Sequence, residues 1–310
     1  MNRRESAWIR IIAWTIVAAV LFLILILGIM GRFHGINIGF GSGYTYADAG
    51  KYKAGPGQID AGQVNELDIN WVDGSVKIQV YDGDTVQFQE TASIKLKKNK
   101  QLHYYNKNGR LMIQYQKSQR SLFSFGNSGN KEVTVKIPKK TADAMGYVGV
   151  DTVSGDTWMK GIHAERMNLD TVSGDINIEE CSAFKLDMDS TSGELIGRGL
   201  DVKDSLETDT TSGNVKIEGN FEAIETDTVS GSVEVISSTC PNKVETDSTS
   251  GEVLLVIPEN DGFTYKMDSV SGSFRCDFEV SQEEDRGEYK NGNASFRFDS
   301  VSGNVSIRKK

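Results

Sequence analysis

The stretch "LDTVSGDINI", Leu169 to Ile178, decides how this chain folds, because the chain repeats it many times. Its centre is a five-residue motif of Asp, Ser or Thr, Val or Thr, Ser and Gly. Eight copies end at Gly155, Gly174, Gly193, Gly213, Gly231, Gly251, Gly272 and Gly303, with gaps of 19, 19, 20, 18, 20, 21 and 31 residues. A period near 20 residues that recurs this often indicates stacked repeats.

Apolar residues flank each motif at alternate positions. In one repeat Val215 and Ile217 follow Gly213, and in the next Val233 and Val235 follow Gly231. Each repeat therefore predicts two short strands with one buried face each. Such a pair cannot bury its apolar face alone, whereas stacking repeats buries a continuous core. We expect an all-β fold, a parallel β-solenoid of the β-helix or β-roll type with about 20 residues per coil, over residues 146–310.

An antiparallel β-sandwich is the alternative fold, because its turns also come every 8–12 residues or so. It does not explain why the same turn sequence returns at every second turn.

Stacked coils would align the motif aspartates in a column: Asp151, Asp170, Asp189, Asp209, Asp227, Asp247, Asp268 and Asp299. Two carboxylates about 5 Å apart repel by about 0.8 kcal/mol in water. We expect each Asp and the serine hydroxyl to bind turn N–H groups, with glycine supplying positive φ. This structural turn ladder includes Ser173, Gly174, Ser192, Gly193, Ser212, Gly213, Ser230, Gly231, Ser250 and Gly251.

Calcium is the alternative use of these aspartates, as in calcium-binding β-rolls rich in glycine and aspartate. Those rolls have a nine-residue repeat, which this sequence lacks. We expect no cofactor, with calcium kept as the alternative.

The N-terminal region predicts a membrane anchor. Residues 11–30 form an uncharged apolar run of 20 residues, preceded by Arg3, Arg4 and Arg10. This length spans about 30 Å, the thickness of a bilayer core, and the basic flank places residues 1–10 in the cytoplasm. A cleaved signal peptide is the alternative, but its apolar region is usually shorter.

Two further segments lie between the predicted anchor and the predicted solenoid. Residues 31–62 contain nine glycines and predict a flexible stalk, with an ordered glycine-rich cap as the alternative. Residues 63–145 predict an irregular β cap that includes a first degenerate coil. Residues 1–150 carry a net charge of +8 and residues 151–310 one of −17, so the acidic bulk of the chain argues against nucleic-acid binding.

A basic segment lies within the predicted cap. Residues 93–140 carry twelve Lys and Arg and one acidic residue. Lysines commonly protect exposed strand edges, which is one interpretation. The other is contact with anionic lipid headgroups or an anionic wall polymer, through Lys95, Lys97, Lys98 and Lys100.

Catalytic motifs are absent from the sequence. It contains no glycine-rich phosphate loop, no G-x-S-x-G and no H-E-x-x-H, and its histidines, His34, His103 and His163, lie far from any nucleophile motif. The repeated aspartates are equivalent to one another, whereas an active site is unique. We therefore expect no enzymatic activity.

The single N-terminal span, the strand ending at "VTVKIP" and the repeated Asp-Ser/Thr-x-Ser-Gly motif resemble a bacterial family of domains of unknown function labelled "putative adhesin", with LiaG-like members linked to envelope stress. The resemblance covers about residues 63–310. It implies a β-repeat ectodomain at a bacterial membrane, single-pass, with envelope polymers or another membrane protein as partners. It implies no catalytic residues.

Overall fold

The computed structural model describes residues 36–39, 43–119, 130–283 and 285–310, which form two compact units divided between Phe184 and Lys185. Both units consist mainly of β-strands. The predicted transmembrane helix, residues 11–30, lies outside the described residues. Among the residues that are described, no helix is long and apolar enough to cross a bilayer.

The N-terminal unit contains the first fourteen strands and short helical turns. Their bounds are β1 Ile36–Gly39, β2 Gly43–Tyr46, η1 Ala49–Lys51, β3 Lys53–Ala54, β4 Gly57–Asp60, η2 Ala61–Gln63, β5 Glu66–Asp73, β6 Val76–Tyr81, β7 Thr85–Ala92, η3 Lys98–Lys100, β8 His103–Lys107, β9 Arg110–Gln114, β10 Lys131–Pro138, α2 Lys139–Ala142, β11 Met145–Ser154, β12 Thr157–Lys160, β13 His163–Thr171 and β14 Ile176–Glu179.

Parallel coils stack within this unit. Strands β5 and β6 form one coil, and β11 and β12 form the next, so that Asn70 pairs with Asp151 and Ile78 with Met159. Strands β13 and β14 continue the stack. On the other side of the β5–β6 coil, β9 and β10 pair in parallel with it, while β4, β7 and β8 add antiparallel pairs. The predicted degenerate coil is therefore part of the stack.

The described part of the glycine-rich segment 31–62 differs from the flexible stalk that we expected. It forms β1 to β4, and the Tyr44 side chain is fully buried. The Tyr44 hydroxyl donates to the Gln114 side chain over 2.8 Å, and the Tyr46 hydroxyl donates to the Gln116 carbonyl over 3.1 Å. These aromatic anchors make the segment an ordered cap, because each buried ring brings its own hydrogen-bond partner.

The C-terminal unit consists of coils with two strands each. Their bounds are β15 Ser182–Ser190 (which begins in the N-terminal unit), β16 Leu195–Thr210, β17 Val215–Phe221, β18 Ala223–Thr228, β19 Val233–Ser237, β20 Lys243–Ser248, β21 Val253–Ile257, β22 Gly262–Ser269, β23 Phe274–Cys276, β24 Ser281–Glu283, β25 Arg286–Lys290, β26 Ala294–Ser300 and β27 Val305–Lys309.

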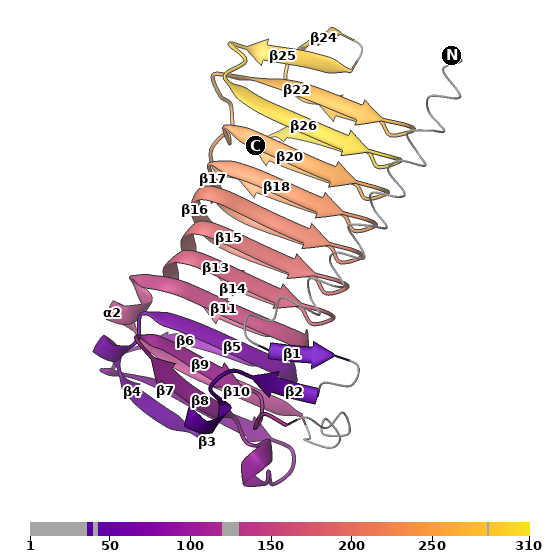
Figure 1. Cartoon of the computed structure of the whole chain (residues 1–310). Coiled ribbons are helices and arrows are strands. Elements are labelled where there is room, and N and C mark those ends of the chain that lie inside the picture. Colours follow the sequence, from indigo (N-terminus) through magenta and orange to yellow (C-terminus); the bar gives the residue numbers. More distant parts are fainter. Residues whose placement is uncertain (1–35, 40–42, 120–129, 284) are drawn as a thin grey trace. The chain divides into compact units, whose positions relative to one another are not determined.

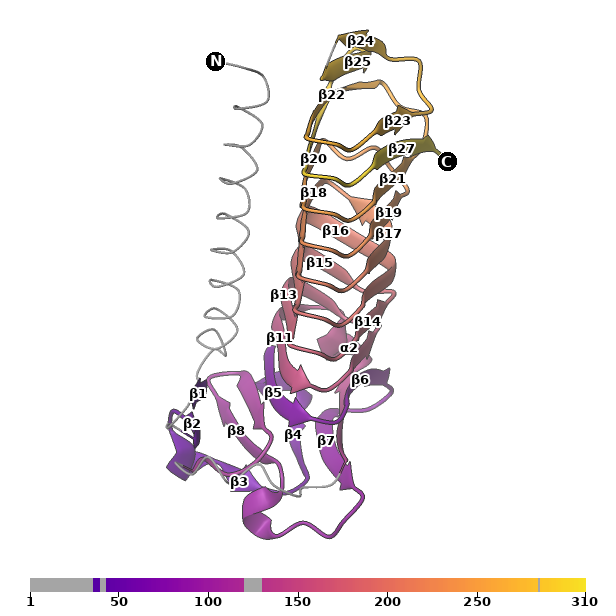
Figure 2. The same ribbon diagram turned by 90° about the vertical axis from the view of Figure 1, so that its right-hand side faces the viewer.

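Two parallel sheets enclose the core of this unit (Figure 2). One sheet runs β16–β18–β20–β26–β22 and the other runs β16–β17–β19–β21–β27–β23, because β16 bends through a bulge and contributes to both. The predicted inward residues, such as Val215, Ile217 and Val233, are at most 2% exposed. The all-β fold of parallel, solenoid-like coils is therefore confirmed.

The last coil of the chain does not lie at the end of the stack. Strand β26 pairs with β20 on one side and with β22 on the other, and β27 pairs likewise with β21 and β23 (Figure 1). The coil of Asp299 therefore lies between those of Asp247 and Asp268. A stack in chain order would instead place the C-terminal coil beyond the coil of Asp268.

The polar insertion before the last coil makes this order possible. It forms the antiparallel strands β24 and β25, and β25 pairs with the outer edge of β22. In sequence, the strands of the terminal coil, β22 and β23, come first, and β25 then covers one edge of β22. Strands β26 and β27 follow and lie between this coil and the coil of β20 and β21. Covering an edge strand in this way removes unpaired N–H and C=O groups that would invite aggregation.

The motif glycines stack on one another. A Cβ atom added to Gly251 would lie 1.8 Å from the Gly231 carbonyl oxygen, and one added to Gly303 would lie 2.0 Å from that of Gly251. In the N-terminal unit Gly155 lies against Gly74 in the same way. None of the eight motif glycines has a positive φ, contrary to our expectation. Glycine is required there because the neighbouring coil occupies the space of a side chain.

Gly251→Ala should destabilise the C-terminal unit by about 3 kcal/mol, because backbone atoms cannot move aside for the new methyl group. Urea unfolding followed by circular dichroism measures the change. The control is Gly50→Ala, since no atom lies within 4 Å of a Cβ at Gly50. That variant should stay within about 0.5 kcal/mol of the parent. Equal stability of both variants would contradict the stacking argument.

Candidate functional site

The Ser or Thr that follows each motif aspartate closes its turn. The Gly251 N–H donates to the Ser248 hydroxyl over 2.9 Å, and the Gly174 N–H donates to the Thr171 hydroxyl over the same distance. The same contact joins Gly193 to Ser190, Gly213 to Thr210, Gly231 to Thr228, Gly272 to Ser269 and Gly303 to Ser300. We expected the aspartate in this role. Strand alternation instead directs the hydroxyl inward and the carboxylate outward.

The motif serine before each glycine links neighbouring coils. The Ser250 hydroxyl donates to the Val229 carbonyl over 3.1 Å, and the Ser250 N–H donates to the same oxygen over 3.0 Å. Ser173 and Ser212 make equivalent bonds to Val153 and Thr191. These serines and glycines therefore belong to the predicted structural ladder, with roles that differ from residue to residue.

The motif aspartates form columns on the outer face of the coils. In the C-terminal unit Asp209, Asp227, Asp247, Asp299 and Asp268 are direct register partners in that order. A second acidic column lies two residues before them, where Glu207, Glu225 and Glu245 align. Asp189 belongs to β15 of the same unit. The alignment that we predicted therefore exists within this unit.

Two carboxyl groups in the middle of this column, those of Asp227 and Asp247, have raised pKa values. Burial, and then the charges of Asp209 and Asp247, raise the pKa of Asp227 to about 7. Burial, and then the charge of Asp299, raise the pKa of Asp247 to about 6. Both causes act against the charged form of the side chain.

In the N-terminal unit Asp151 and Asp170 are register partners. Asp151 is 7% exposed, and burial followed by the charge of Asp170 raises its pKa well above the usual range. A hydrogen bond joins the two side chains. Because two ionised carboxylates in contact would repel strongly, the proximity of Asp170 favours the protonated form of Asp151.

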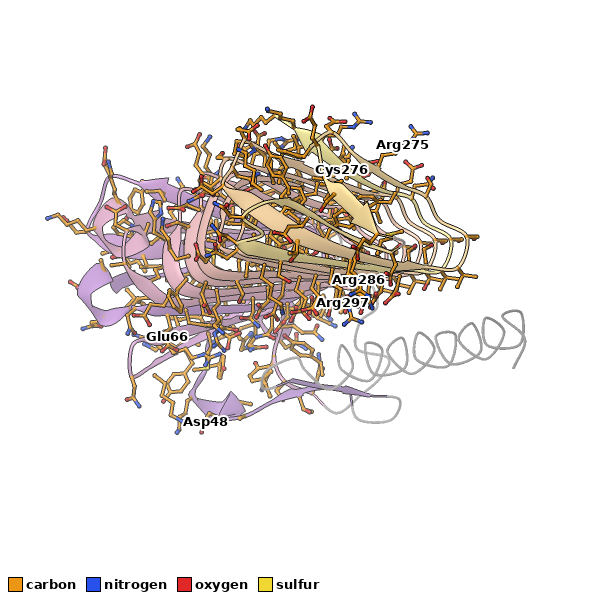
Figure 3. The ribbon with its side chains drawn as sticks, turned by 90° about the horizontal axis from the view of Figure 1, so that it is seen from above. Asp48, Glu66, Arg275, Cys276, Arg286 and Arg297 are labelled. Atoms are coloured by element: carbon orange, nitrogen blue, oxygen red, sulfur yellow. The ribbon has the colours of Figure 1, made fainter. Side chains whose placement is uncertain are left out.

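Basic residues end the acidic columns of the C-terminal unit. Arg297 takes the place of glutamate on β26 and binds Asp299 over 2.7 Å, and Lys266 on β22 binds Asp268 over 2.6 Å. Arg286 of β25 lies opposite Lys266 of β22 in the register of the two antiparallel strands. Figure 3 shows Arg297 and Arg286 on the same side of the unit, with Arg275 on the other side. Arg297 and Lys266 thus neutralise the last two carboxylates of the column, Asp299 and Asp268.

The calcium alternative finds no ready-made site. Among the described residues, no three His, Cys, Asp or Glu side chains are grouped so that they could hold a metal ion. In a stacked column each carboxylate faces two others edge to edge, whereas calcium takes six to eight oxygen ligands around one point.

The four lysines named from the sequence separate into two kinds. Lys95, Lys97 and Lys98 are exposed in the loop between β7 and β8. Lys100 is half-buried, and its ammonium donates to the Gln116 side-chain oxygen over 3.0 Å. The structure therefore brings together three exposed cations and turns the fourth toward the protein.

Lys131 is a buried cation that the sequence analysis missed. Its side chain is fully buried, and its ammonium forms an ion pair with Glu90 at 2.8 Å and donates to the carbonyls of Lys100 and Tyr115. The ammonium also lies 4.8 Å from the Trp71 ring centre. Burial lowers the pKa of Lys131 to about 8, although Glu90 acts against this shift. The alternation of Lys131 with Val133, Val135 and Ile137 was the available signal.

The sequence profile of Toastrack DUF4097 matches residues 64–308, which covers the coils of both units. The chain belongs to this Toastrack family. The resemblance drawn from the repeat motif is thereby confirmed at the level of the family. A comparison with curated proteins finds no match.

Three solved structures are similar to this Toastrack chain. A "putative cell adhesion protein" from Clostridium sporogenes has 14% identity and a TM-score of 0.28, covering 84% of this chain and 100% of its own. A "putative lipid binding protein" from Parabacteroides distasonis has 18% identity and a TM-score of 0.49, with 82% and 96% covered. A "putative adhesin" from Bacteroides fragilis has 12% identity and a TM-score of 0.35, with 82% and 97% covered.

The acidic column predicts a pH-dependent stability. A carboxyl whose pKa is raised by folding stabilises the folded state below its unfolded pKa of about 3.9 and loses that contribution as pH rises through the folded value. Asp227 loses it as pH rises toward about 7. The free energy of unfolding of the C-terminal unit should therefore fall between about pH 4 and about pH 7, as measured by urea titration. Asp227→Asn should reduce this fall and stabilise the unit at pH 8 by about 1 kcal/mol. Glu218→Gln, at an exposed position outside the column, should leave the profile unchanged.

Lys131→Met should destabilise the N-terminal unit by about 3–5 kcal/mol, because it leaves the Glu90 carboxylate buried without its cation. The double variant Lys131→Met/Glu90→Gln should recover at least half of the loss, since Gln still accepts the Leu102 N–H. Urea unfolding followed by the near-ultraviolet circular dichroism of Trp71 and Tyr115 measures both. Equal losses in the two variants would contradict a role of the ion pair.

Proposed function

We propose that this Toastrack chain is a membrane-anchored, extracytoplasmic repeat protein of the bacterial cell envelope that binds or scaffolds and does not catalyse a reaction. The observation that carries the proposal is the use of the motif. In the described coils its hydroxyls and glycines close turns and join coils, as Ser248, Ser250 and Gly251 do. These repeated residues therefore serve the architecture of the coils, which supports a binding or scaffolding role.

The anchor rests on the sequence of residues 1–30. An uncharged run of 20 residues follows Arg3, Arg4 and Arg10, which favours a single span with its N-terminus in the cytoplasm. The folded units would then stand outside, where an envelope polymer or another membrane protein is the partner. A role in sensing envelope stress, as implied by the likeness to LiaG-like proteins, is part of the same proposal.

A second candidate is a cation-binding or polysaccharide-processing ectodomain. The raised pKa values of Asp227 and Asp247 favour it, because a bound cation would relieve the repulsion in the column. Isothermal calorimetry with calcium separates the two candidates. Several saturable sites with a large rise in melting temperature would support the second one, and loss of a defined polysaccharide on incubation would support an enzyme.

The anchor is tested with alkaline phosphatase fused after Lys310, since this reporter is active only outside the cytoplasm. We expect activity, and we expect the chain to remain with membranes after carbonate extraction. Replacing Leu21 and Leu23 by Arg should abolish membrane retention, because each Arg at the centre of a span costs about 2.5–3.5 kcal/mol. A shortened, released product in the parent chain would show a cleaved signal peptide and contradict the anchor.

A further inference from the structure

The loop between β7 and β8, residues 93–101, presents cations around an exposed apolar side chain. Ile94 is 43% exposed, and Lys95, Lys97 and Lys98 are exposed beside it. No ion pair joins these three lysines to any carboxylate among the described residues. The first acidic residue on either side of the loop in the sequence is already paired, Glu90 with Lys131 and Glu132 with Lys77.

The backbone of this loop is held in place. The Lys100 N–H donates to the Lys97 carbonyl over 2.7 Å, and the Ser93 N–H donates to the Asn130 carbonyl over 3.2 Å. Figure 2 shows the loop extending beyond the strands of the N-terminal unit. The side chains are therefore displayed on an ordered frame, so that contact with a surface costs little further ordering.

Protection of a strand edge does not explain these lysines. They lie outside any strand, in the loop and in η3, where no row of strand N–H and C=O groups is open. An exposed isoleucine among them also weakens that interpretation, since a protective loop has no use for a large apolar side chain at its surface. A combination of cations and one apolar side chain fits a lipid interface, which offers both charge and an apolar phase.

The position of the loop in the chain brings it to a bilayer. This step rests on the proposed anchor at residues 11–30. Only residues 31–35 separate that segment from β1, and five extended residues reach at most about 18 Å. The N-terminal unit is then confined near the membrane, where a weak contact suffices because its effective concentration is high.

We propose that the loop of residues 93–101 docks the N-terminal unit onto anionic phospholipid headgroups, with Ile94 entering the interface and Lys95, Lys97 and Lys98 binding phosphate groups. An anionic wall polymer would engage the lysines but would offer Ile94 no apolar phase. The charge of −17 on residues 151–310 is repelled by the same headgroups, so that the attraction of an anionic bilayer comes from the basic part of the chain.

The test uses the full chain in vesicles. An environment-sensitive fluorophore is attached to the Ile94→Cys variant. Cys240 and Cys276 are partly exposed and are replaced by Ser, whereas Cys181 is retained because it is buried. The matched control is Val270→Cys on the C-terminal unit, where the exposure is also 43%. In vesicles with phosphatidylglycerol we expect a blue shift and quenching by brominated lipid at position 94 and neither at position 270. Both signals should vanish in phosphatidylcholine alone or in about 0.5 M salt, where screening is strong.

Replacing Lys95, Lys97 and Lys98 by Gln should weaken docking about a hundredfold, because each lysine near an anionic surface strengthens adsorption about fivefold. The equivalent change at Lys139 and Lys140, exposed in the same unit, should have little effect. Equal signals at positions 94 and 270 would overturn the proposal, as would a shift that soluble poly(glycerol phosphate) produces and lipid does not. If the chain fails to float with the vesicles, the anchor itself has failed; if it floats and position 94 stays unquenched, only the docking has failed.

Discussion

The close contact between motif glycines governs the rest of this structure. Coils of a parallel stack lie about 4.8 Å apart, and at the turn the backbone of one coil enters the space that a side chain of the next would fill. Gly231, Gly251 and Gly303 meet this condition one after another. Because the contact is between backbones, the same turn serves one coil after another. It aligns the turns of neighbouring coils even though the number of residues between motif glycines varies.

The same contact dictates the polar chemistry around it. A turn pressed against its neighbour has little room for water, so its N–H groups need partners from the protein. Ser248 supplies one within the coil and Ser250 another between coils. Stacking in register also has a cost, since it buries Asp227 and places it between Asp209 and Asp247, and both effects raise its pKa. Arg297 limits this cost on β26, where it binds Asp299.

Much of the fold could be predicted from the sequence, because period-two alternation and a 20-residue repeat leave few arrangements that bury the apolar faces. The order of the last coils could not be predicted, because the motifs at Asp268 and Asp299 have the same sequence and do not show which coil lies next to that of Asp247. The burial of Lys131 was visible in its alternation with Val133, but a lysine is usually exposed. For the turns, the repeated motif identified the right residues. Only the structure shows that Thr228, and not Asp227, accepts the turn N–H of Gly231.

The coil of Asp299 gives this unit an order of coils that differs from their order in the sequence. Strands β26 and β27 follow β22 and β23 in the chain, yet they lie between the coil of β22 and that of β20. The parallel pairing of β22 and β23 with the rest of the unit therefore depends on residues that come about thirty positions later in the sequence, so that changes in β26 or β27 should also loosen the coil of Asp268.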